Sequence, residues 1–187
     1  MDELENTEPE VQTSLWLDQS LVVNADTVYS NTVGGEQKLV GRDVEVTLPE
    51  IKYEVLETTA MGKFELAQIH KFEPMEMTIK HIGIDSGLAA LCMAEMLEIE
   101  IRWVEQVMIE DKSIITVGCK AFINAHPQVA TPKIKVKNGQ GIDISIPYHV
   151  NGYKLVRDGV VLWDINRLSQ KFIVNNVDYY AHLESMI

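Results

Sequence analysis

From Trp16 onward the sequence alternates apolar and polar residues with a period of two, which is typical of β-strands that bury one face. Residues 75–82 alternate in this way, as do residues 98–109 and 114–123. Each such strand needs a second layer against which to bury its apolar face. We therefore expect a mainly β protein, built as an antiparallel sandwich or a partly open barrel.

The alternation changes phase at Pro49. Apolar residues occupy the even positions in residues 43–48, and the odd positions from Ile51 to Val55. Because proline cannot donate a hydrogen bond to a neighbouring strand, we expect a bend, a bulge or a strand break at this point.

The last third of the chain contains dipeptides that favour tight turns. Asn138-Gly139, Asn151-Gly152 and Asp158-Gly159 all tolerate the positive φ angles that short hairpins require. They predict turns between strands at 133–137, 142–150, 153–157 and 160–166. A further strand at 171–175 should end at Asn175-Asn176, and a short helix capped by Asp178 should close the chain.

One segment has a helical pattern. Residues 87–97 are rich in helix formers and follow Asp85-Ser86, either of which can cap the first turn. We expect a helix over 87–97 that packs on the sheet through Leu88, Leu91 and Cys92. It is the single flanking α-helix of the predicted fold.

Length and charge narrow the classes of function. The chain has 187 residues, enough for one well-buried core, and a net charge of −12, which argues against tight binding to nucleic acid. Residues 1–14 are polar, acidic and aperiodic, so we expect a flexible arm followed by a single β domain over 15–187. The first residues lack the pattern of a secretory signal, and no stretch has the ~20 apolar residues that cross a bilayer. We expect a protein made in the cytoplasm that stays there or leaves as part of a particle.

The sequence contains no motif for catalysis, a metal or a cofactor. None of the five histidines forms an i, i+4 pair, and CxxC and HExxH are absent. His81, Asp85 and Ser86 are the residue types of nucleophilic catalysis, and a small β-barrel hydrolase that uses them is one alternative. Ser86 lacks the G-x-S-x-G turn that would expose it, so capping of the helix is the preferred interpretation.

Two sets of charged residues lie on polar faces of predicted strands. Lys133, Lys135 and Lys137 share one face, and we favour a solvated face or a protected sheet edge over a binding patch for an acidic partner. A second set consists of carboxylates, Asp43, Glu45 and Glu54. Simple solvation is the stronger interpretation of these carboxylates, and a sheet with one acidic face and one core face that lines a water-filled lumen is the alternative.

The order of motifs in residues 41–85 resembles the major tail tube proteins of contractile-tailed phages and R-type tailocins. Gly41 leads into a strand ending Glu-Val-Thr-Leu-Pro, followed by Glu54 and a turn at Ala60-Met61-Gly62, where alanine replaces the family's first glycine. The C-terminal segments 158–162, 164–166 and 172–179 resemble the family's closing strands. They contain the family-like residues Asp164, Asn166, Asn176 and Asp178, with Asn176 in place of the usual glycine.

This resemblance implies a β-sandwich with a flanking helix, assembled into hexameric rings whose strands join into a continuous β-barrel lumen. The rings would stack into a conduit for DNA, or for ions in a tailocin, with no catalytic residue, metal or cofactor. Asp43, Glu45 and Glu54 would face the lumen. The loop between rings would consist of Glu57, Thr58, Thr59, Ala60, Met61, Gly62 and Lys63.

The resemblance also implies partners and a location. The partners would be further copies of the chain, a tail sheath, baseplate and tail-terminator proteins, and a tape-measure protein in the lumen. DNA would pass transiently without specific binding, and no membrane would be involved. The protein would be assembled in the bacterial cytoplasm and end in the virion tail. An alternative is the related tube of a secretion system that carries effector cargo.

Overall fold

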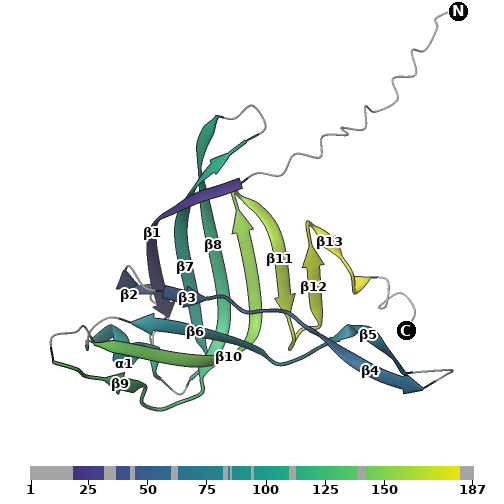
Figure 1. Ribbon diagram of the computed structural model, residues 1–187, viewed down its shortest axis with the longest axis horizontal. Helices are drawn as coiled ribbons and strands as arrows, with labels where there is room; N and C mark the ends of the chain where they lie inside the picture. The colour runs from purple at the N-terminus through teal and green to yellow at the C-terminus, as the bar shows by residue number, and fades with distance from the viewer. Residues whose placement is uncertain are drawn as a thin grey trace, which may run out of the picture.

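The structure is a computed structural model that describes residues 19–31, 37–42, 45–59, 63–81, 84, 86–93, 95–109, 113–138 and 142–181. The predicted arm at 1–14 lies outside the described residues. The described part is mainly antiparallel β with one short helix, as predicted (Figure 1). Its strands are β1 (Gln19–Asn31), β2 (Gln37–Arg42), β3 (Glu45–Thr47), β4 (Tyr53–Thr59), β5 (Lys63–Phe72), β6 (Met75–His81), β7 (Leu97–Met108), β8 (Ile114–Pro127), β9 (Lys133–Lys135), β10 (Asp143–Arg157), β11 (Val160–Asn166), β12 (Lys171–Val174) and β13 (Val177–Asp178).

Eleven strands form one sheet, and β4 and β5 form a separate hairpin. The main path of the large sheet runs β13-β12-β11-β10-β8-β7-β1-β2, and it does not close into a barrel within the described residues. A second part of the same sheet has the order β3-β6-β10-β9. We call this part the short sheet. The expected break at Pro49 is confirmed, because β3 ends at Thr47 and β4 begins at Tyr53.

Strand β10 belongs to both parts of the sheet. Its residues 144–150 pair with β6, whereas residues 152–157 pair with β11. The predicted turn at Asn151-Gly152 is therefore wrong, because this dipeptide lies inside one long strand, where the register with β8 shifts. A Cβ on Gly152 would lie 3.3 Å from the Asn124 side-chain amide, so the missing side chain permits a close approach of two strands.

Two other dipeptides of the C-terminal third adopt the predicted turns, whereas Gly139 of the predicted turn at Asn138-Gly139 lies outside the described residues. Asp158 and Gly159 have φ angles of 49° and 78°, and Asn175 and Asn176 have 47° and 64°. Positive φ at both central residues gives the backbone twist that suits a two-residue hairpin. The first of these turns joins β10 to β11 and the second joins β12 to β13, and both pairs are antiparallel hairpins.

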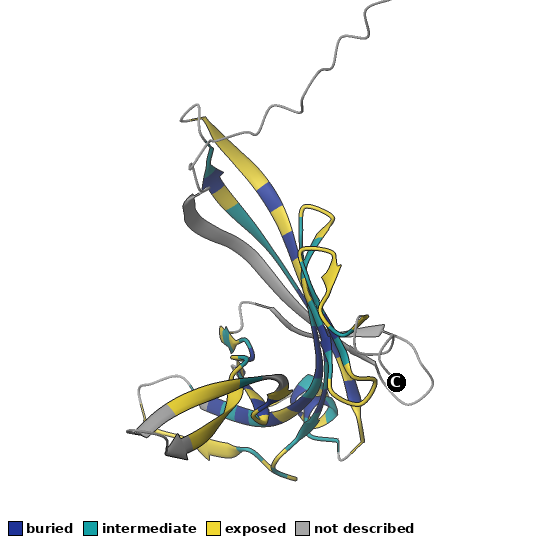
Figure 2. Cartoon of the chain, turned by 90° about the vertical axis from the view of Figure 1, so that its right-hand side faces the viewer, coloured by how far each residue is buried: buried dark blue, intermediate teal, exposed yellow. Residues whose placement is uncertain are grey.

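The core lies between the short sheet and the large sheet, which meet at an angle (Figure 2). Strand β6 alternates strictly, so that Met75, Met77 and Ile79 are buried while Glu76 and Lys80 are exposed. The facing layer comes from the other strands of the sandwich, and includes Ile99, Ile101, Ala121, Ile123, Tyr153 and Ile165.

The helix α1 (Ser86–Leu91) is shorter than the predicted 87–97. Leu88 and Leu91 are buried and Cys92 packs against the same core, as expected. The helix ends early because β7 must begin at Leu97, whose side chain is also buried. The amides of Cys92 and Met93 bond back to the carbonyl groups of Ala89 and Ala90, which tightens the final turn.

Tyr148 ties the helix to the sandwich. Its hydroxyl donates a 2.8 Å hydrogen bond to the Leu91 carbonyl oxygen. Burial raises the pKa of Tyr148, and it raises the pKa of Tyr153 to about 12.

We expect Tyr148→Phe to lower the free energy of unfolding by about 1–3 kcal/mol, because it leaves the Leu91 carbonyl oxygen without this donor. Urea unfolding followed by circular dichroism measures the loss. Tyr153→Phe, at a buried tyrosine in the same strand, is the control and should cost less. Equal losses in the two variants would contradict a special role for the Tyr148 hydroxyl.

Candidate functional site

The outer face of the short sheet is a continuous polar surface. Cross-strand pairing aligns Glu45, Lys80, Ser145 and Lys133 in one row, in that order from β3 to β9. Thr47, Thr78 and Pro147 form the next row. Residues directly opposite each other share a face of a sheet, so these side chains point away from the core.

The described charges on this face are mixed. The Lys80 ammonium group pairs with the Glu45 carboxylate. Farther along β6, the Gln128 amide donates to Glu76 Oε1 at 3.1 Å and lies 3.3 Å from His149 Nδ1. The rings of His149 and His126 are 5.4 Å apart. On this face Glu45 is thus balanced by a lysine, whereas Glu76 lies beside a glutamine and a histidine.

The residues that the sequence predicts to face a lumen do not lie together on one sheet. Glu45 is exposed on β3, at one edge of the short sheet. Glu54 is exposed on β4, in the separate hairpin, where the register with β5 shifts. Asp43 lies outside the described residues.

The β4–β5 hairpin, which carries the predicted inter-ring loop 57–63, extends away from the sandwich (Figure 1). Residues 60–62 at its end lie outside the described residues. Farther back, Val55, Leu56 and Leu66 are 49%, 50% and 56% exposed. Glu57 lies directly opposite Glu65, and such like-charged pairs destabilise a hairpin. A two-stranded ribbon is marginal in water on its own, so this hairpin gains most from a partner.

Aromatic rings hold the base of this hairpin on the sandwich. Tyr53 and Phe72 open and close the hairpin with ring centroids 5.3 Å apart. Phe72 meets Phe172 of β12 edge to face at 4.9 Å, and Phe172 also contacts Tyr179 and Tyr180. The base is therefore fixed, while the apolar side chains farther along are exposed.

The family-like C-terminal residues build local structure. Asp164 accepts a 2.6 Å hydrogen bond from Lys171 and lies 3.9 Å from the Lys154 ammonium group. Asn166 accepts from the amides of Leu168 and Ser169, Asn176 forms a turn, and Asp178 accepts from the Tyr180 amide. This last bond is of the kind expected at a helix cap, and residues 182–187 of the predicted helix lie outside the described residues.

The described residues do not form an exposed catalytic or metal site at the positions that the sequence singled out. His81 is only 4% exposed within β6, whereas Ser86 is exposed at the start of α1, and Asp85 lies outside the described residues. No cluster of His, Cys, Asp and Glu in the described part of the chain suits a metal ion. Nor does that part contain a helix of the length and apolarity required to cross a membrane.

Sequence reasoning missed two features of these surfaces. The first is the apolar side of β9: a protected edge was predicted for its lysines, but not the exposure of Ile134 on its other face and of Val136 just after it. The alternating segment 133–137, Lys-Ile-Lys-Val-Lys, was a signal for such a two-faced edge strand. The second is the exposed pair Leu56 and Leu66, which only the cross-strand register brings together.

Comparison with known proteins identifies the family. Residues 27–187 match the family described as phage tail tube protein FII. No curated protein sequence matches the chain. Among solved structures, the chain is similar to one in an extracellular contractile injection system (PVC sheath-tube complex in extended state), with 13% identity, 71% of this chain and 86% of that chain covered, and a TM-score of 0.39. The family match covers most of the sequence, so this chain belongs to the phage tail tube protein FII family and is a structural subunit of a tail tube.

Proposed function

We propose that this subunit assembles into hexameric rings that stack into a hollow tube, with the outer face of the short sheet lining the lumen. The observation that carries this proposal is the two-faced short sheet. One face is packed into the core, the other is polar, and in the described residues both outer strands have an open edge. Joining such sheets around a ring removes the open edges and produces a closed, water-filled barrel.

The mixed charges of this face suit passage of DNA without binding. Tight binding to the phosphate backbone requires a set of uncompensated Lys and Arg side chains. On this face Lys80 is paired with Glu45, Lys133 and Lys135 lie at the β9 edge, and the whole chain carries a net charge of −12. The lumen would contain a tape-measure protein during assembly and then pass DNA, or ions in a headless particle.

The remaining surfaces would contact the other parts of a tail. The β4–β5 hairpin with loop 57–63 would contact the next ring, and the outside of the tube would contact a contractile sheath. The ends would meet baseplate and tail-terminator proteins. The role is structural, without catalysis, in a tail assembled in the bacterial cytoplasm.

Negative-stain electron microscopy of the purified protein over a concentration series tests this function. We expect hollow rings or tubes of uniform diameter with sixfold end views. A gold-maleimide label on Thr78→Cys, at the centre of the polar face, should then add density on the tube axis. Monomers at every concentration, which also fail to extend on added tail baseplates, would overturn the tube proposal.

A further inference from the structure

The outer face of the large sheet, which points away from the core, carries rows of charged side chains. One row crosses the sheet from β7 to β12 and consists of Glu100, Phe122, Lys154, Asp164 and Ile173. The rows on either side of it contain Arg102 opposite Lys120, and Asn166 opposite Lys171. Residues paired in this way share a face of the sheet. We call the four bases of these rows, Arg102, Lys120, Lys154 and Lys171, the basic ladder.

The bases of this face are more exposed than most of its acids. The side chains of Glu100 and Asp164 are only 6% and 15% exposed. Those of the three bases that pair with them are 40%, 40% and 41% exposed. Hydrogen bonds of 2.6 Å join Arg102 to Glu100 and Lys171 to Asp164, so each carboxylate is partly covered by a base. A partner that approaches the face here therefore meets cationic groups first.

The middle of the face combines an exposed lysine with an apolar ring. Lys120 forms no ion pair within the described part of the chain. Phe122, two residues farther along β8, is 39% exposed. Glu98 is an exposed acid on the same side of β7, but the four bases still outnumber the three acids that these rows carry from β7 to β12. The face therefore fits an acidic segment that carries an apolar residue among its carboxylates.

Residues 1–10 have this composition. They contain no base and five acids, which are Asp2, Glu3, Glu5, Glu8 and Glu10. Leu4 lies between two of these acids. The proposed tube gives the segment no role, although it contributes five negative charges to a chain whose net charge is −12.

The start of β1 places this segment within reach of the basic ladder of its own subunit. β1 begins at Gln19, which lies opposite Met108 beside the end of the β7–β8 hairpin. Arg102 is six residues back along β7, about 20 Å away at ~3.3 Å per residue. Residues 11–18 can span up to about 26 Å, enough to carry the acidic residues onto the face. A tethered segment has a high effective concentration, which favours its own subunit over a neighbouring copy.

We propose that residues 2–10 bind across the basic ladder of their own subunit, with Leu4 against Phe122. The segment then shields a basic surface, and any other acidic partner of this face must displace it. Such a contact depends on exposed charges, so it weakens as salt is added. The inference goes beyond the proposed tube, because it concerns a single copy and holds with or without ring formation.

A labelled peptide with the sequence of residues 1–12 tests this contact on the full-length protein. An arm variant carries Glu3→Gln, Glu5→Gln, Glu8→Gln and Glu10→Gln, which leave the basic ladder without its own acidic segment. At low salt, fluorescence anisotropy should show that the peptide binds the arm variant at least about tenfold more tightly than wild type, because the wild-type segment competes from within the chain. A peptide with the same four glutamine changes should bind neither protein.

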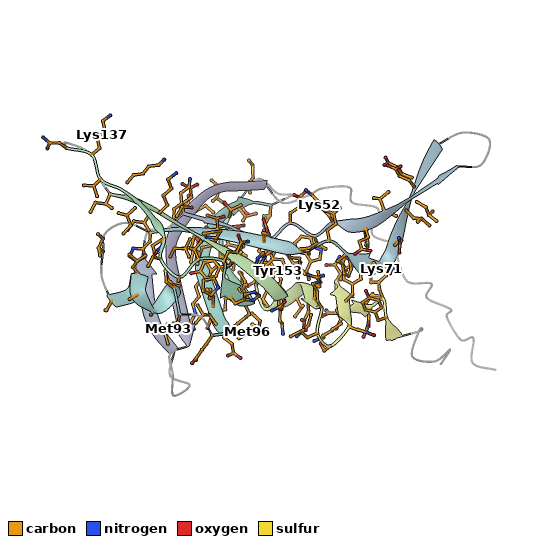
Figure 3. The ribbon with its side chains drawn as sticks, turned by 90° about the horizontal axis from the view of Figure 1, so that it is seen from below. Lys52, Lys71, Met93, Met96, Lys137 and Tyr153 are labelled. Carbon is orange, nitrogen blue, oxygen red and sulfur yellow. The ribbon has the colours of Figure 1, made fainter. Side chains whose placement is uncertain are left out.

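Single lysine changes in the arm variant locate the site. Lys120→Glu reverses the exposed charge in the middle of the ladder and should weaken peptide binding at least about fivefold. Lys135→Glu is the matched control and should leave the affinity unchanged. Lys133, Lys135 and Lys137 form another exposed basic group, with Lys137 at the end of a segment that projects from the body (Figure 3). Because both changes are at exposed lysines, circular dichroism should show that both proteins fold as the arm variant does.

Three results would overturn the proposal. Equal affinity for wild type and the arm variant would mean that the face is open for another acidic partner, such as a segment of a sheath. Absence of binding to the arm variant would mean that the ladder does not take this segment. Weakening by Lys135→Glu as large as that by Lys120→Glu would mean that the peptide does not select this face. In each case, ring formation still decides the tube proposal separately.

Discussion

A protein that carries Leu56→Glu and Leu66→Glu is expected to fold and form rings as wild type does, but not to stack these rings into tubes. The two leucines lie directly opposite each other on the β4–β5 hairpin, and each is about half exposed. Charges at both positions would make a dry contact with a second ring unfavourable, because they would be buried without partners.

The β4–β5 hairpin has little support from the rest of the subunit beyond its base. It is a separate two-stranded sheet, and it places Glu57 opposite Glu65. Its base is fixed by the packing of Tyr53 and Phe72 on Phe172, well away from the two leucines. Changes at Leu56 and Leu66 should therefore alter the free energy of unfolding by less than about 1 kcal/mol, since neither side chain contributes to the buried core.

Sedimentation velocity and electron microscopy distinguish rings from tubes. We expect the double variant to accumulate as single rings at concentrations where wild type forms tubes. Leu168→Glu, at an exposed leucine in the turn after β11, is the matched control and should leave tubes intact. Leu56→Met with Leu66→Met should also stack, because methionine preserves the apolar contact. Tubes of normal length from the glutamate variant would show that the hairpin does not join the rings.

Local patterns predicted most of the strands, because the alternation of apolar and polar residues involves only residues that are close in the sequence. The alternation in 75–82 and 114–123 records which side of a strand is buried, and the structure buries that side over 75–81 and 117–123 but leaves Ile115 exposed. Asp158-Gly159 and Asn175-Asn176 adopt the turn conformations that their residue types favour. In these places local preference and tertiary packing agree.

Asn151-Gly152 shows why the same reasoning failed elsewhere. The dipeptide has the chemistry of a tight turn, but β8 pairs with residues on both sides of it and keeps β10 continuous. The Asn151 carbonyl oxygen accepts from the Arg167 amide, so it is paired with a distant segment, whereas at the tip of a local turn it would have no backbone partner. The helix α1 is likewise shorter than predicted, because β7 begins at Leu97. The continuity of β10 and the length of α1 both depend on contacts with residues far away in the sequence, which local patterns cannot predict.

The candidate surfaces depend even more on long-range pairing. The sequence shows that Glu45 and Lys133 lie on polar faces, but only the order β3-β6-β10-β9 places them at opposite edges of one face. Glu45 and Glu54 lie in different sheets, although both occupy polar faces of predicted strands. A period of two tells which residues share a side of one strand, not which strand lies beside it.

The second large effect is expected at Ile146, where β10 contributes to the core of the sandwich. Its side chain is fully buried and lies opposite Ile79 of β6, which is also fully buried. Truncation to alanine removes apolar contacts and leaves a cavity that strands paired on both sides cannot easily close. We expect Ile146→Ala to lower the free energy of unfolding by about 2–5 kcal/mol.

The matched control for this change is one residue away. Ser145 belongs to the same strand but lies on the polar face, in the row with Lys80 and Lys133, so Ser145→Ala should cost less than about 1 kcal/mol. Urea unfolding of dilute protein, at concentrations below assembly, measures both changes. Because the polar face depends on the packing beneath it, Ile146→Ala should also raise the concentration needed for ring formation. Equal costs at positions 145 and 146 would mean that the two layers of the sandwich do not pack against each other through β10.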